Sequence, residues 1–304
     1  MHPAAPAHPE SVEGDRLGGG GPVTVVMITR DRCASAVRSV IGLRKLPDAP
    51  RIIVVDNGSG DDTVATLSDY DGVRVIAAGR NLGAAGRTLG VRCAGTPYVA
   101  FSDDDSWWAP GALLTAAELF DRHPRLGVVV GRTLVGPAAV DDPLNALLTS
   151  AAFGSDPDLP GPNALGFLAC ATVVRRSAFV DAGGFHPRFG VGGEEALLAL
   201  DLVMAGWGIA YVEEVVAHHH PATAGERPGR RVVMARNDLW TSWLRRRRPA
   251  LTTITRAAVR ASSRDPVARQ ALAQAVGGLP WVVRQRRPVP PGLEEMLQRV
   301  GPPT

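Results

Sequence analysis

The chain alternates four times between a short, continuously apolar run and a segment with the apolar periodicity of a helix. The apolar runs are 23–28, 51–55, 73–77, 98–101 and, after the last helical segment, 126–130; the helical segments are 33–45, 61–70, 83–94 and 110–122. Apolar runs without polar alternation are typical of strands buried on both faces, as in parallel sheets. The pattern therefore predicts a doubly wound α/β fold with a mostly parallel sheet.

Polar residues follow three of these runs, at the places where strands are expected to end. They are Thr29-Arg30-Asp31, Asp56-Asn57-Gly58-Ser59 and Ser102-Asp103-Asp104-Asp105. In open α/β sheets, ligands bind beyond the carboxyl ends of the strands, so we expect the functional site there. Neither a G-x-G-x-x-G sequence nor a P-loop follows the first run, so a bound nucleotide must be held by side chains.

The triplet Asp103-Asp104-Asp105 is the strongest local signal. Three acids at the end of a buried strand are costly unless a positive charge neutralises them. The alternate carboxylates Asp103 and Asp105 can share one divalent cation that also takes phosphate oxygens. The alternatives are a solvated turn, or an N-cap formed by Asp105 for the helix after Trp108.

Two further polar positions suit a nucleotide. The carboxylate of Asp56 can accept hydrogen bonds from ribose hydroxyls or from a base N–H, although Asn57-Gly58 behind it is also a common turn sequence. Arg87, on the third expected helix, can pair with a diphosphate, and the alternative is an ordinary surface arginine.

Glu194 and Glu195 open an expected helix over about 194–205, directly after two glycines. Acids in a first helical turn are favoured by the helix dipole. A carboxylate fixed at a glycine-lined mouth is also what a general base requires. The triplet His218-His219-His220 ends a strand-like segment, and beside an acidic cation site it indicates one metal ligand.

The pattern changes after residue 131. Residues 136–163 are rich in Pro, Gly, Asp and Ala and predict a long loop, while 209–212 and 215–217 predict edge strands. From Arg230 onward the chain is helical and basic. The predicted organisation is a flexible leader over 1–21, an α/β domain over 22–228 with halves 22–131 and 132–228, and a helical basic region over 229–304.

Composition excludes several classes of protein. With 304 residues, 45% of them hydrophobic and 21% charged, the chain is typical of soluble globular proteins. No apolar run reaches the roughly 18 residues of a membrane span, and residues 1–21 lack a signal-peptide core, so we expect a cytoplasmic protein. Cys33, Cys93 and Cys170 form neither a disulfide framework nor a zinc pattern, and are interpreted as small buried residues.

The net charge of +3 hides an asymmetry between the two ends of the chain. From residue 227 onward there are 16 arginines and four acids, whereas the residues before it carry 26 acids and 17 basic groups. Trp240 and Trp243 precede the run Arg245–Arg248. Tryptophan with arginine on helices suits peripheral contact with an anionic membrane surface. The alternative is packing of these tryptophans on the α/β domain, and no module for nucleic acid is recognised.

Seven segments resemble, in order, the family 2 glycosyltransferases with the GT-A fold, a Rossmann-like α/β fold, most closely bacterial members of actinobacterial type. The segments are VTVVMITRDR, IIVVDNGSGDDT, NLGAAGRTLG, YVAFSDDDSWWAPG, RRSAFVDAGGF, GGEEALLALDLVMAGW and VVAHHH. The resemblance covers residues 22–245. It implies an inverting transfer of sugar from a nucleotide-diphosphate sugar to an acceptor hydroxyl, without a covalent intermediate.

The resemblance also implies roles for the residues of the donor site. Asp56 holds the nucleotide, and Thr29 and Asp31 flank its base. Asp103 and Asp105 bind Mn²⁺ or Mg²⁺ together with the diphosphate. Asp104, between them, lies near the ribose or the sugar, and Arg87 helps to neutralise the leaving diphosphate.

On the acceptor side, the resemblance makes Glu195 the general base, with Glu194 beside it. The late histidine ligand of the metal falls on His218, with His219 or His220 as alternatives. Trp107 and Trp108 either stack on a sugar or an aromatic acceptor, or pack in the interior. The acceptor itself, whether a glycan, a lipid-linked sugar or a small molecule, is left open, and its pocket is expected in the loops 136–163 and 186–193.

The chain departs from the family pattern at several places. Glu195 stands where the family usually has Asp, Ser102 replaces the usual Leu, and Asp201 stands where an Arg is common. One alternative is a binding protein that keeps the fold and has lost catalysis, which the change at position 195 favours. Another is a nucleotidyltransferase, which the lack of glycines in Thr29-Arg30-Asp31-Arg32 disfavours.

Overall fold

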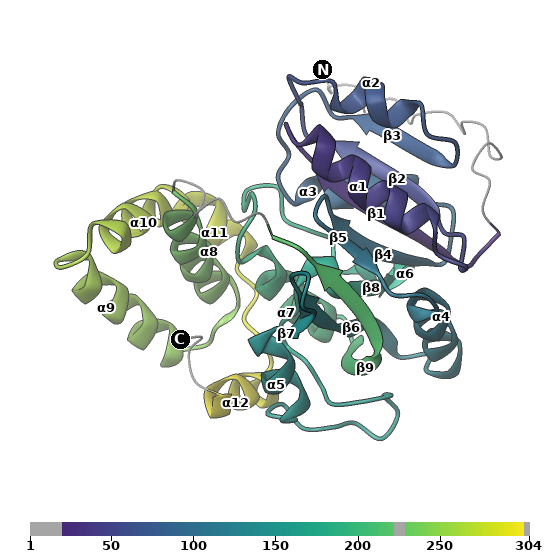
Figure 1. The fold of residues 1–304 in the computed structure, drawn as a ribbon. Coiled ribbons are helices and arrows are strands. Elements are labelled where there is room, and N and C mark those ends of the chain that lie inside the picture. The colour runs from purple at the N-terminus through teal and green to yellow at the C-terminus, as the bar shows by residue number, and fades with distance from the viewer. Residues whose placement is uncertain (1–19, 222–228, 301–304) are drawn as a thin grey trace, which may run out of the picture.

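The computed structural model describes residues 20–221 and 229–300, and the predicted leader over 1–21 lies almost wholly outside the described residues. The predicted α/β alternation is confirmed (Figure 1). The first half runs through β1 Val23–Thr29, α1 Cys33–Arg44, β2 Arg51–Asp56, α2 Thr63–Ser68, β3 Val73–Ala77, α3 Ala85–Cys93, β4 Tyr98–Asp103, β5 Ser106–Trp108, α4 Ala112–Arg122 and β6 Leu126–Val135. The second half continues through β7 Val140–Asp141, α5 Pro143–Thr149, a 3₁₀ turn Ala169–Ala171, β8 Thr172–Arg175, α6 Arg176–Asp181, α7 Glu194–Met204 and β9 Gly208–His219.

The strands form one sheet in the order β3-β2-β1-β4-β8-β6-β9-β5, with β7 added beside β6. Strands β1 to β4 are mutually parallel, and β9 runs parallel to β6, while β8, β5 and β7 pair antiparallel with their neighbours. The chain leaves β1 toward β2 and β3 and then crosses to β4 on the other side of β1. Such a reversal of strand order opens a crevice at the carboxyl ends of β1 and β4.

Helices cover both faces of the sheet, as doubly wound packing requires. One core packs α1, α2 and α4 on the odd residues of β1, such as Val25 and Met27. The other packs α3, α6 and α7 on the even residues, such as Val26. This strict alternation of the strand's side chains explains why the run 23–28 is apolar without interruption.

Two expectations for the second half were wrong in part. The predicted loop 136–163 contains α5, whose first turn is capped by the Asp142 side chain accepting from the Leu144 N–H at 2.9 Å, with Pro143 following the cap. The two predicted edge strands are one strand, β9, which lies between β6 and β5. A bulge separates its apolar runs, and Gly131 of β6 is required there, since a Cβ would lie 2.3 Å from the Val215 carbonyl oxygen.

The basic region beyond residue 229 is helical, as predicted, and its helices lie beside the α/β part (Figure 1). They are α8 Arg230–Arg245, α9 Ala250–Ser262, α10 Pro266–Gly277, α11 Leu279–Gln285 and α12 Pro291–Val300. Trp240, Trp243 and Trp281 are buried in a core that also contains Phe189 and Leu197 of the α/β part. The expectation that Trp240 and Trp243 meet a membrane is therefore wrong, because these side chains fasten α8 to α7.

One buried ion pair joins the same two helices. Arg245 of α8 donates to both carboxylate oxygens of Asp201 on α7, at 2.6 and 2.9 Å. Asp201 stands where the resembled family commonly has an arginine, and in this chain its carboxylate pairs with an arginine of the C-terminal helices. Within the described residues, no helix has the length and apolarity needed to cross a bilayer.

Candidate active site

The polar ends of β1, β2 and β4 meet at one edge of the sheet, as the sequence predicted. Parallel pairing places Thr29 opposite Asp56 and Ile28 opposite Asp103. The strands that supply these residues are buried, so their carboxyl ends are held rigidly by the two cores. A ligand that enters the crevice between β1 and β4 therefore meets side chains with little freedom to move.

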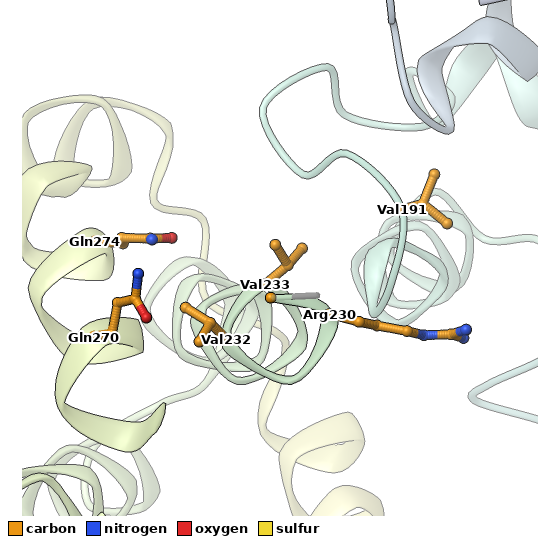
Figure 2. A pocket seen from close by; sticks show the side chains of 7 residues that line it. Val191, Arg230, Val232, Val233, Gln270 and Gln274 are labelled. Atoms are coloured by element: carbon orange, nitrogen blue, oxygen red, sulfur yellow. The ribbon is translucent and has the colours of Figure 1, made fainter. Parts of the chain in front are cut away.

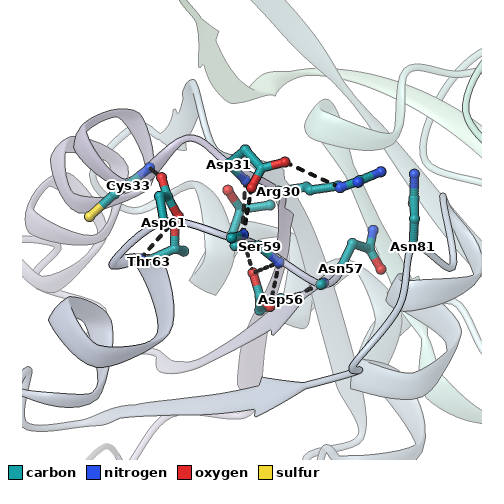
Figure 3. A network of polar contacts seen from close by, with 12 residues as sticks. Arg30, Asp31, Cys33, Asp56, Asn57, Ser59, Asp61, Thr63 and Asn81 are labelled. Carbon is teal, nitrogen blue, oxygen red and sulfur yellow. Dashed lines mark hydrogen bonds and ion pairs between the residues drawn. The ribbon is translucent and has the colours of Figure 1, made fainter.

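Asp56 closes a small network of polar contacts with the loop behind it (Figure 3). One of its oxygens accepts from the backbone N–H groups of Gly58 and Ser59 at 3.1 and 3.0 Å, and the other accepts from the Ser59 hydroxyl. Gly58 has a φ of +77°, and a Cβ there would approach the backbone of Arg80 to 3.0 Å. The two interpretations of this segment, an Asn57-Gly58 turn and a well-ordered Asp56 carboxylate, are thus compatible.

Asp31 extends this network from the end of β1 (Figure 3). Its backbone N–H donates to the Ser59 hydroxyl at 2.9 Å, and its carboxylate accepts from the Gly60 N–H at 2.7 Å. Asp31 adopts a φ of 53°, which is rare for a residue with a side chain. Asp31 and Asp56, two of the residues that the sequence assigned to the nucleotide, are therefore joined in one hydrogen-bond network.

Asp104 is buried at the end of β4 and has its own partners. It accepts from the Thr29 hydroxyl at 2.9 Å and pairs with Arg32 at 2.9 Å. Burial raises the pKa of Asp104 to about 6, against the opposing effect of Arg32. The carboxylate thus faces Thr29 and Arg32 in the interior, where it fixes the end of β1 to the end of β4.

One buried arginine, Arg87, lies between Asp103 and Glu194 and interacts with both carboxylates. The Arg87 side chain is 3% exposed, forms an ion pair with Asp103 through Nη2, and lies 3.8 Å from Glu194 through Nη1. Burial would lower the pKa of Arg87, but Asp103, Glu194 and Glu195 together raise it above its ordinary value. The alternative of a surface arginine is therefore wrong.

Glu194 and Glu195 begin α7 after Gly193, as predicted, but they differ in environment. Glu194 is buried, and its carboxylate accepts from the Gly192 N–H. Glu195 is half-buried, and burial together with the adjacent charge of Glu194 raises its pKa to about 8. A carboxyl that is partly accessible and has a pKa near neutrality matches what general-base catalysis requires.

The structure brings His219, rather than His218, to the carboxylates. The His219 Nε2 atom lies 3.5 Å from an oxygen of Asp105, and Asp105 raises the pKa of His219. Successive side chains of β9 point to opposite faces, so His218 is directed away and stacks with Trp107 at 6.0 Å between ring centroids. Of the three histidines, His219 is therefore the one that this geometry brings beside the carboxylates, whereas the sequence favoured His218 as the metal ligand.

Asp105 supplies the second carboxylate of the Asp103–Asp105 motif. Arg32 contacts it at 3.0 Å, and the nearby His219 and Arg32 hold its pKa below the ordinary value in spite of burial. The alternative role of Asp105 as an N-cap is wrong, because residues 106–108 form β5 and α4 begins only at Ala112.

Trp107 and Trp108 point to opposite sides of β5. Trp108 is 1% exposed and belongs to the core under α4, so it does not reach the crevice. Trp107 is half-buried and borders a hollow of about 300 Å³ between α1 and β5. The residues lining this hollow are Ser35, Arg38, Ser39, Ile41, Gly42, Lys45, Asp105, Trp107 and His220.

A second hollow, of about 290 Å³, lies between the loop that contains Val191 and the helices α8 and α10 (Figure 2). Val191 lines it from the glycine-rich loop, Arg230 and Val233 from α8, and Gln270 and Gln274 from α10. Val191 precedes Glu194 by three residues, in the loop that leads into α7. Helices α8 and α10 therefore line this hollow together with Val191 of the loop 186–193, one of the loops in which the sequence analysis expects the acceptor pocket.

Two residues of the site escaped the sequence analysis. Arg32 neutralises Asp104 and Asp105, and its place one residue after Asp31 was the available signal. Cys170, interpreted as a simple buried residue, lies among charged groups of the site, and burial raises its pKa well above the ordinary value. No signal in the sequence connects Cys170 with Asp103, because the pairing of β8 with β4 brings them together.

Comparison with known proteins supports the resemblance. The model of the family Glycosyl transferase family 2 matches residues 24–182. An N-acetylglucosaminyl-diphospho-decaprenol L-rhamnosyltransferase from Mycobacterium tuberculosis is 31% identical over 211 residues, which cover 58% of this chain and 69% of that protein. The O-antigen chain rhamnosyltransferase RfbN of Salmonella typhimurium is 26% identical, with 58% of this chain and 59% of that protein covered.

Solved structures agree on the fold. A mannosyltransferase from Pyrobaculum calidifontis, in complex with GDP-Man and Mn²⁺, superposes with a TM-score of 0.54 at 18% identity, covering 89% of this chain and 87% of that chain. Residues 1–349 of TarS from S. aureus, in complex with UDP-GlcNAc, give a TM-score of 0.53 at 15% identity, covering 71% and 66%. The family match spans more than half of the chain, and on that ground this protein belongs to glycosyl transferase family 2 and is a nucleotide-sugar glycosyltransferase.

Proposed function

We propose that this chain transfers a sugar with inversion from a nucleotide-diphosphate sugar, with Glu195 as the general base and a divalent cation at the Asp103–Asp105 motif. The observation that carries the proposal is the position of Arg87, which contacts Asp103 on one side and approaches Glu194 on the other. One ionic cluster thus connects the donor motif with the start of α7. Donor and acceptor groups of a single displacement must meet at such a place.

The side chains that could bind the cation as ligands are those of Asp103, Asp105 and His219. Two carboxylates and an imidazole suit Mn²⁺, and carboxylates with water suit Mg²⁺. The 3.5 Å separation of His219 and Asp105 is short enough for both to reach one ion. A bound cation would neutralise charge on the departing diphosphate. Asp56, Asp31 and the end of β1 are proposed to receive the nucleoside.

The roles that we propose for Arg87, Asp104 and Thr29 at the nucleotide-sugar site follow from their contacts. Arg87 makes its ion pair with Asp103, and we propose that it acts on the diphosphate through the carboxylates that it holds in place. Asp104 and Thr29 bind each other and keep β1 and β4 in register beside the nucleotide. These two residues are therefore proposed to position the site.

Glu195 is proposed to take the proton of the acceptor hydroxyl. Its carboxyl is half-buried, and its pKa of about 8 makes it a stronger base than an exposed glutamate. Glu194 keeps its place beside Arg87 and the Gly192 N–H. The extra methylene of Glu195, compared with the aspartate usual in the family, would carry the base further toward the acceptor.

For the donor sugar we propose a 6-deoxyhexose of the rhamnose type. The support is that both curated relatives described above are named rhamnosyltransferases. The test is turnover with a panel of nucleotide sugars in the presence of Mn²⁺ or Mg²⁺, with hydrolysis of the donor measured separately. Use of a nucleotide-activated rhamnose at least about tenfold above that of hexoses supports this assignment, and preference for another sugar overturns it.

For the acceptor we propose a lipid-linked sugar that enters by the hollow beside Val191. The amide side chains of Gln270 and Gln274 in that hollow can hydrogen-bond sugar hydroxyls. One relative is named for an acceptor of this type, an N-acetylglucosaminyl-diphospho-decaprenol. Val283 on α11 is 70% exposed beside Arg284, which offers an apolar and basic contact to a membrane surface.

Sedimentation with vesicles tests the membrane contact. Vesicles that contain anionic lipid are expected to sediment the protein at low salt, and the double variant Val283→Asp with Arg284→Glu should reduce this binding. The single control Val140→Asp changes an equally solvent-exposed valine on β7, away from α11. Absence of binding at every ionic strength would remove the membrane contact from the proposal and leave the donor site untouched.

We also propose the domain organisation that the sequence predicted, with residues 22–228 as the catalytic domain and the helices beyond 229 as an extension. The shared core of Phe189, Leu197 and Trp240 supports an extension that is fixed to the catalytic domain. Proteolysis at the segment before Gly229 should leave the two pieces associated, and their separation on gel filtration would contradict a fixed extension.

A further inference from the structure

Cys170 occupies an unusual position for a buried cysteine. It is 4% exposed and lies in the 3₁₀ turn that precedes β8. Its neighbours Ala169 and Ala171 belong to the apolar cores on the two faces of the sheet, whereas Cys170 belongs to neither. The charges that act on its thiol come from Asp103, Arg87, Asp105 and Glu195. Packing of a small apolar side chain therefore does not account for this cysteine.

The Sγ atom of Cys170 joins two other potential ligands. One oxygen of Asp103, one nitrogen of His219 and this sulfur all lie within 4.8 Å of one another. Three separate elements, β4, β9 and the 3₁₀ turn, bring them together. Among the described residues, this is the one group of three or more His, Cys, Asp or Glu side chains with ligand atoms so close.

A second observation indicates that the group is incomplete without a ligand. Arg87, which pairs with Asp103, has buried Nε and Nη1 atoms without a hydrogen-bond partner. Unsatisfied buried donors of this kind cost free energy unless a ligand or water satisfies them. A cation at Asp103 that carries an anionic ligand would place acceptors near these donors.

We propose that Cys170 is a thiolate ligand of the cation, so that this chain has a mixed oxygen, nitrogen and sulfur site. The inference rests on the proposed function, because it assumes a cation at Asp103 and His219. A carboxylate, an imidazole and a thiolate together favour Zn²⁺, Co²⁺ and Mn²⁺ over Mg²⁺, since Mg²⁺ prefers oxygen ligands. The thiol loses its proton to solvent when the sulfur binds the ion.

The test is a titration of the full-length protein with Co²⁺, read by absorption. A cobalt–thiolate bond gives a near-ultraviolet charge-transfer band, which a site of oxygen and nitrogen ligands lacks. We expect the band in the wild type and in Cys93→Ser, and its loss in Cys170→Ser. A separate titration with Mn²⁺, in which the paramagnetic resonance signal of the free ion is measured, reports whether a cation binds at all.

The affinities provide the second readout. Cys170→Ser should weaken Co²⁺ and Zn²⁺ by at least about tenfold, the lower end of what changes around a metal site cost, and should leave Mg²⁺ nearly unchanged. A melting temperature of Cys170→Ser equal to that of the wild type, both without metal, excludes misfolding as the cause of weaker binding. A wild type that binds Mn²⁺ without showing the cobalt band overturns the role of Cys170 alone. A wild type that binds no cation, with or without nucleotide, overturns this role and the proposed cation site together.

Discussion

Arg87 carries a full positive charge at a place where it has almost no contact with water. Such a charge is tolerated because Asp103 and Glu194 face it, and each of those carboxylates in turn depends on the arginine. The charge balance of the donor motif and that of the glutamate pair are therefore coupled. At the scale of single residues, the site works as one electrostatic unit, in which changing one group alters its neighbours.

Replacement of Glu195 by Gln should separate catalysis from folding. Loss of the base is expected to lower sugar transfer about 10²- to 10⁴-fold, the usual contribution of a positioned acid or base. Nucleotide binding, measured by thermal shift, should stay within about twofold. A variant that retains more than about a tenth of the wild-type rate would exclude Glu195 as the base.

The pH dependence follows from the pKa of about 8 for Glu195. The base acts when deprotonated, so kcat/KM should rise with pH, reach half of its maximum near pH 8 and level off above that pH. The sign for stability is opposite, because the pKa lies above the unfolded value of 4.5. The folded state holds the proton more tightly, so this group's stabilising effect is present below about pH 4.5 and is lost as pH rises through 8. Melting curves of the wild type and Glu195→Gln should diverge over that window, and parallel curves would contradict the raised pKa.

The histidine triplet offers a matched pair of variants. His219→Ala should weaken Mn²⁺ binding by at least about tenfold, because the residue beside Asp105 is lost. His218→Ala removes a side chain that stacks on Trp107 and should leave the Mn²⁺ affinity unchanged. Titration of each variant with Mn²⁺ checks the assignment, and the reverse order of effects would restore His218.

Helix α7 links the catalytic residues to the C-terminal helices. It begins with the glutamate pair, contributes Leu198 to the core under the sheet, and contributes Leu197 to the core shared with α8. Asp201, also on α7, forms the buried ion pair with Arg245 of α8. The orientation of Glu195, the proposed base, is thus fixed at the scale of elements, by two cores and one buried ion pair.

Breaking this ion pair should be costly. Arg245→Met leaves Asp201 buried without its partner and should lower the free energy of unfolding by about 3–5 kcal/mol. The double variant Asp201→Leu with Arg245→Met should recover much of that loss, since no charge is then stranded. Arg132→Met, in the solvent-exposed pair with Asp141, is the control and should change stability far less. Denaturant unfolding of the four proteins gives the comparison, and equal losses for both ion pairs would refute a structural role for Arg245.

Most strands and helices could be predicted because the runs of β1, β2, β4 and the first half of β6 are buried on both faces, and the helices show the apolar periodicity of a helix. Helix α5 was predictable in principle, since Asp142-Pro143 is a capping sequence. It was hidden by the composition of the surrounding segment. Strand β9 was divided at its bulge, which depends on the pairing of Gly131 with β9 and leaves no sign in the local sequence.

The donor motif was predictable because parallel strands place their carboxyl ends together. The choice between His218 and His219 was not, because it depends on the register of β9 against β5. The same limit applies to Cys170, whose place follows from β8 pairing with β4. Contacts between strands that are distant in the sequence decide these details.

At the scale of the whole molecule, the basic helices pack beside the α/β part and carry much of the positive charge. Their tryptophans face inward, so the exposed arginines and Val283 form the surface that is offered to a partner. In the proposed function, the protein thus combines a donor site at the sheet edge, a base at the start of α7 and a basic surface on the C-terminal helices. This arrangement suits an acceptor that approaches from an anionic surface.

The most direct test of the account is the melting temperature of the wild type and of Asp105→Ala with nucleoside diphosphates, each with and without Mn²⁺. A ligand that binds only the native state raises the melting temperature by mass action. We predict a rise for at least one diphosphate that requires Mn²⁺ and is lost in Asp105→Ala, while the variant without ligand still unfolds cooperatively. A rise of the same size without Mn²⁺, or in Asp105→Ala, would contradict a cation-dependent donor site at the Asp103–Asp105 motif.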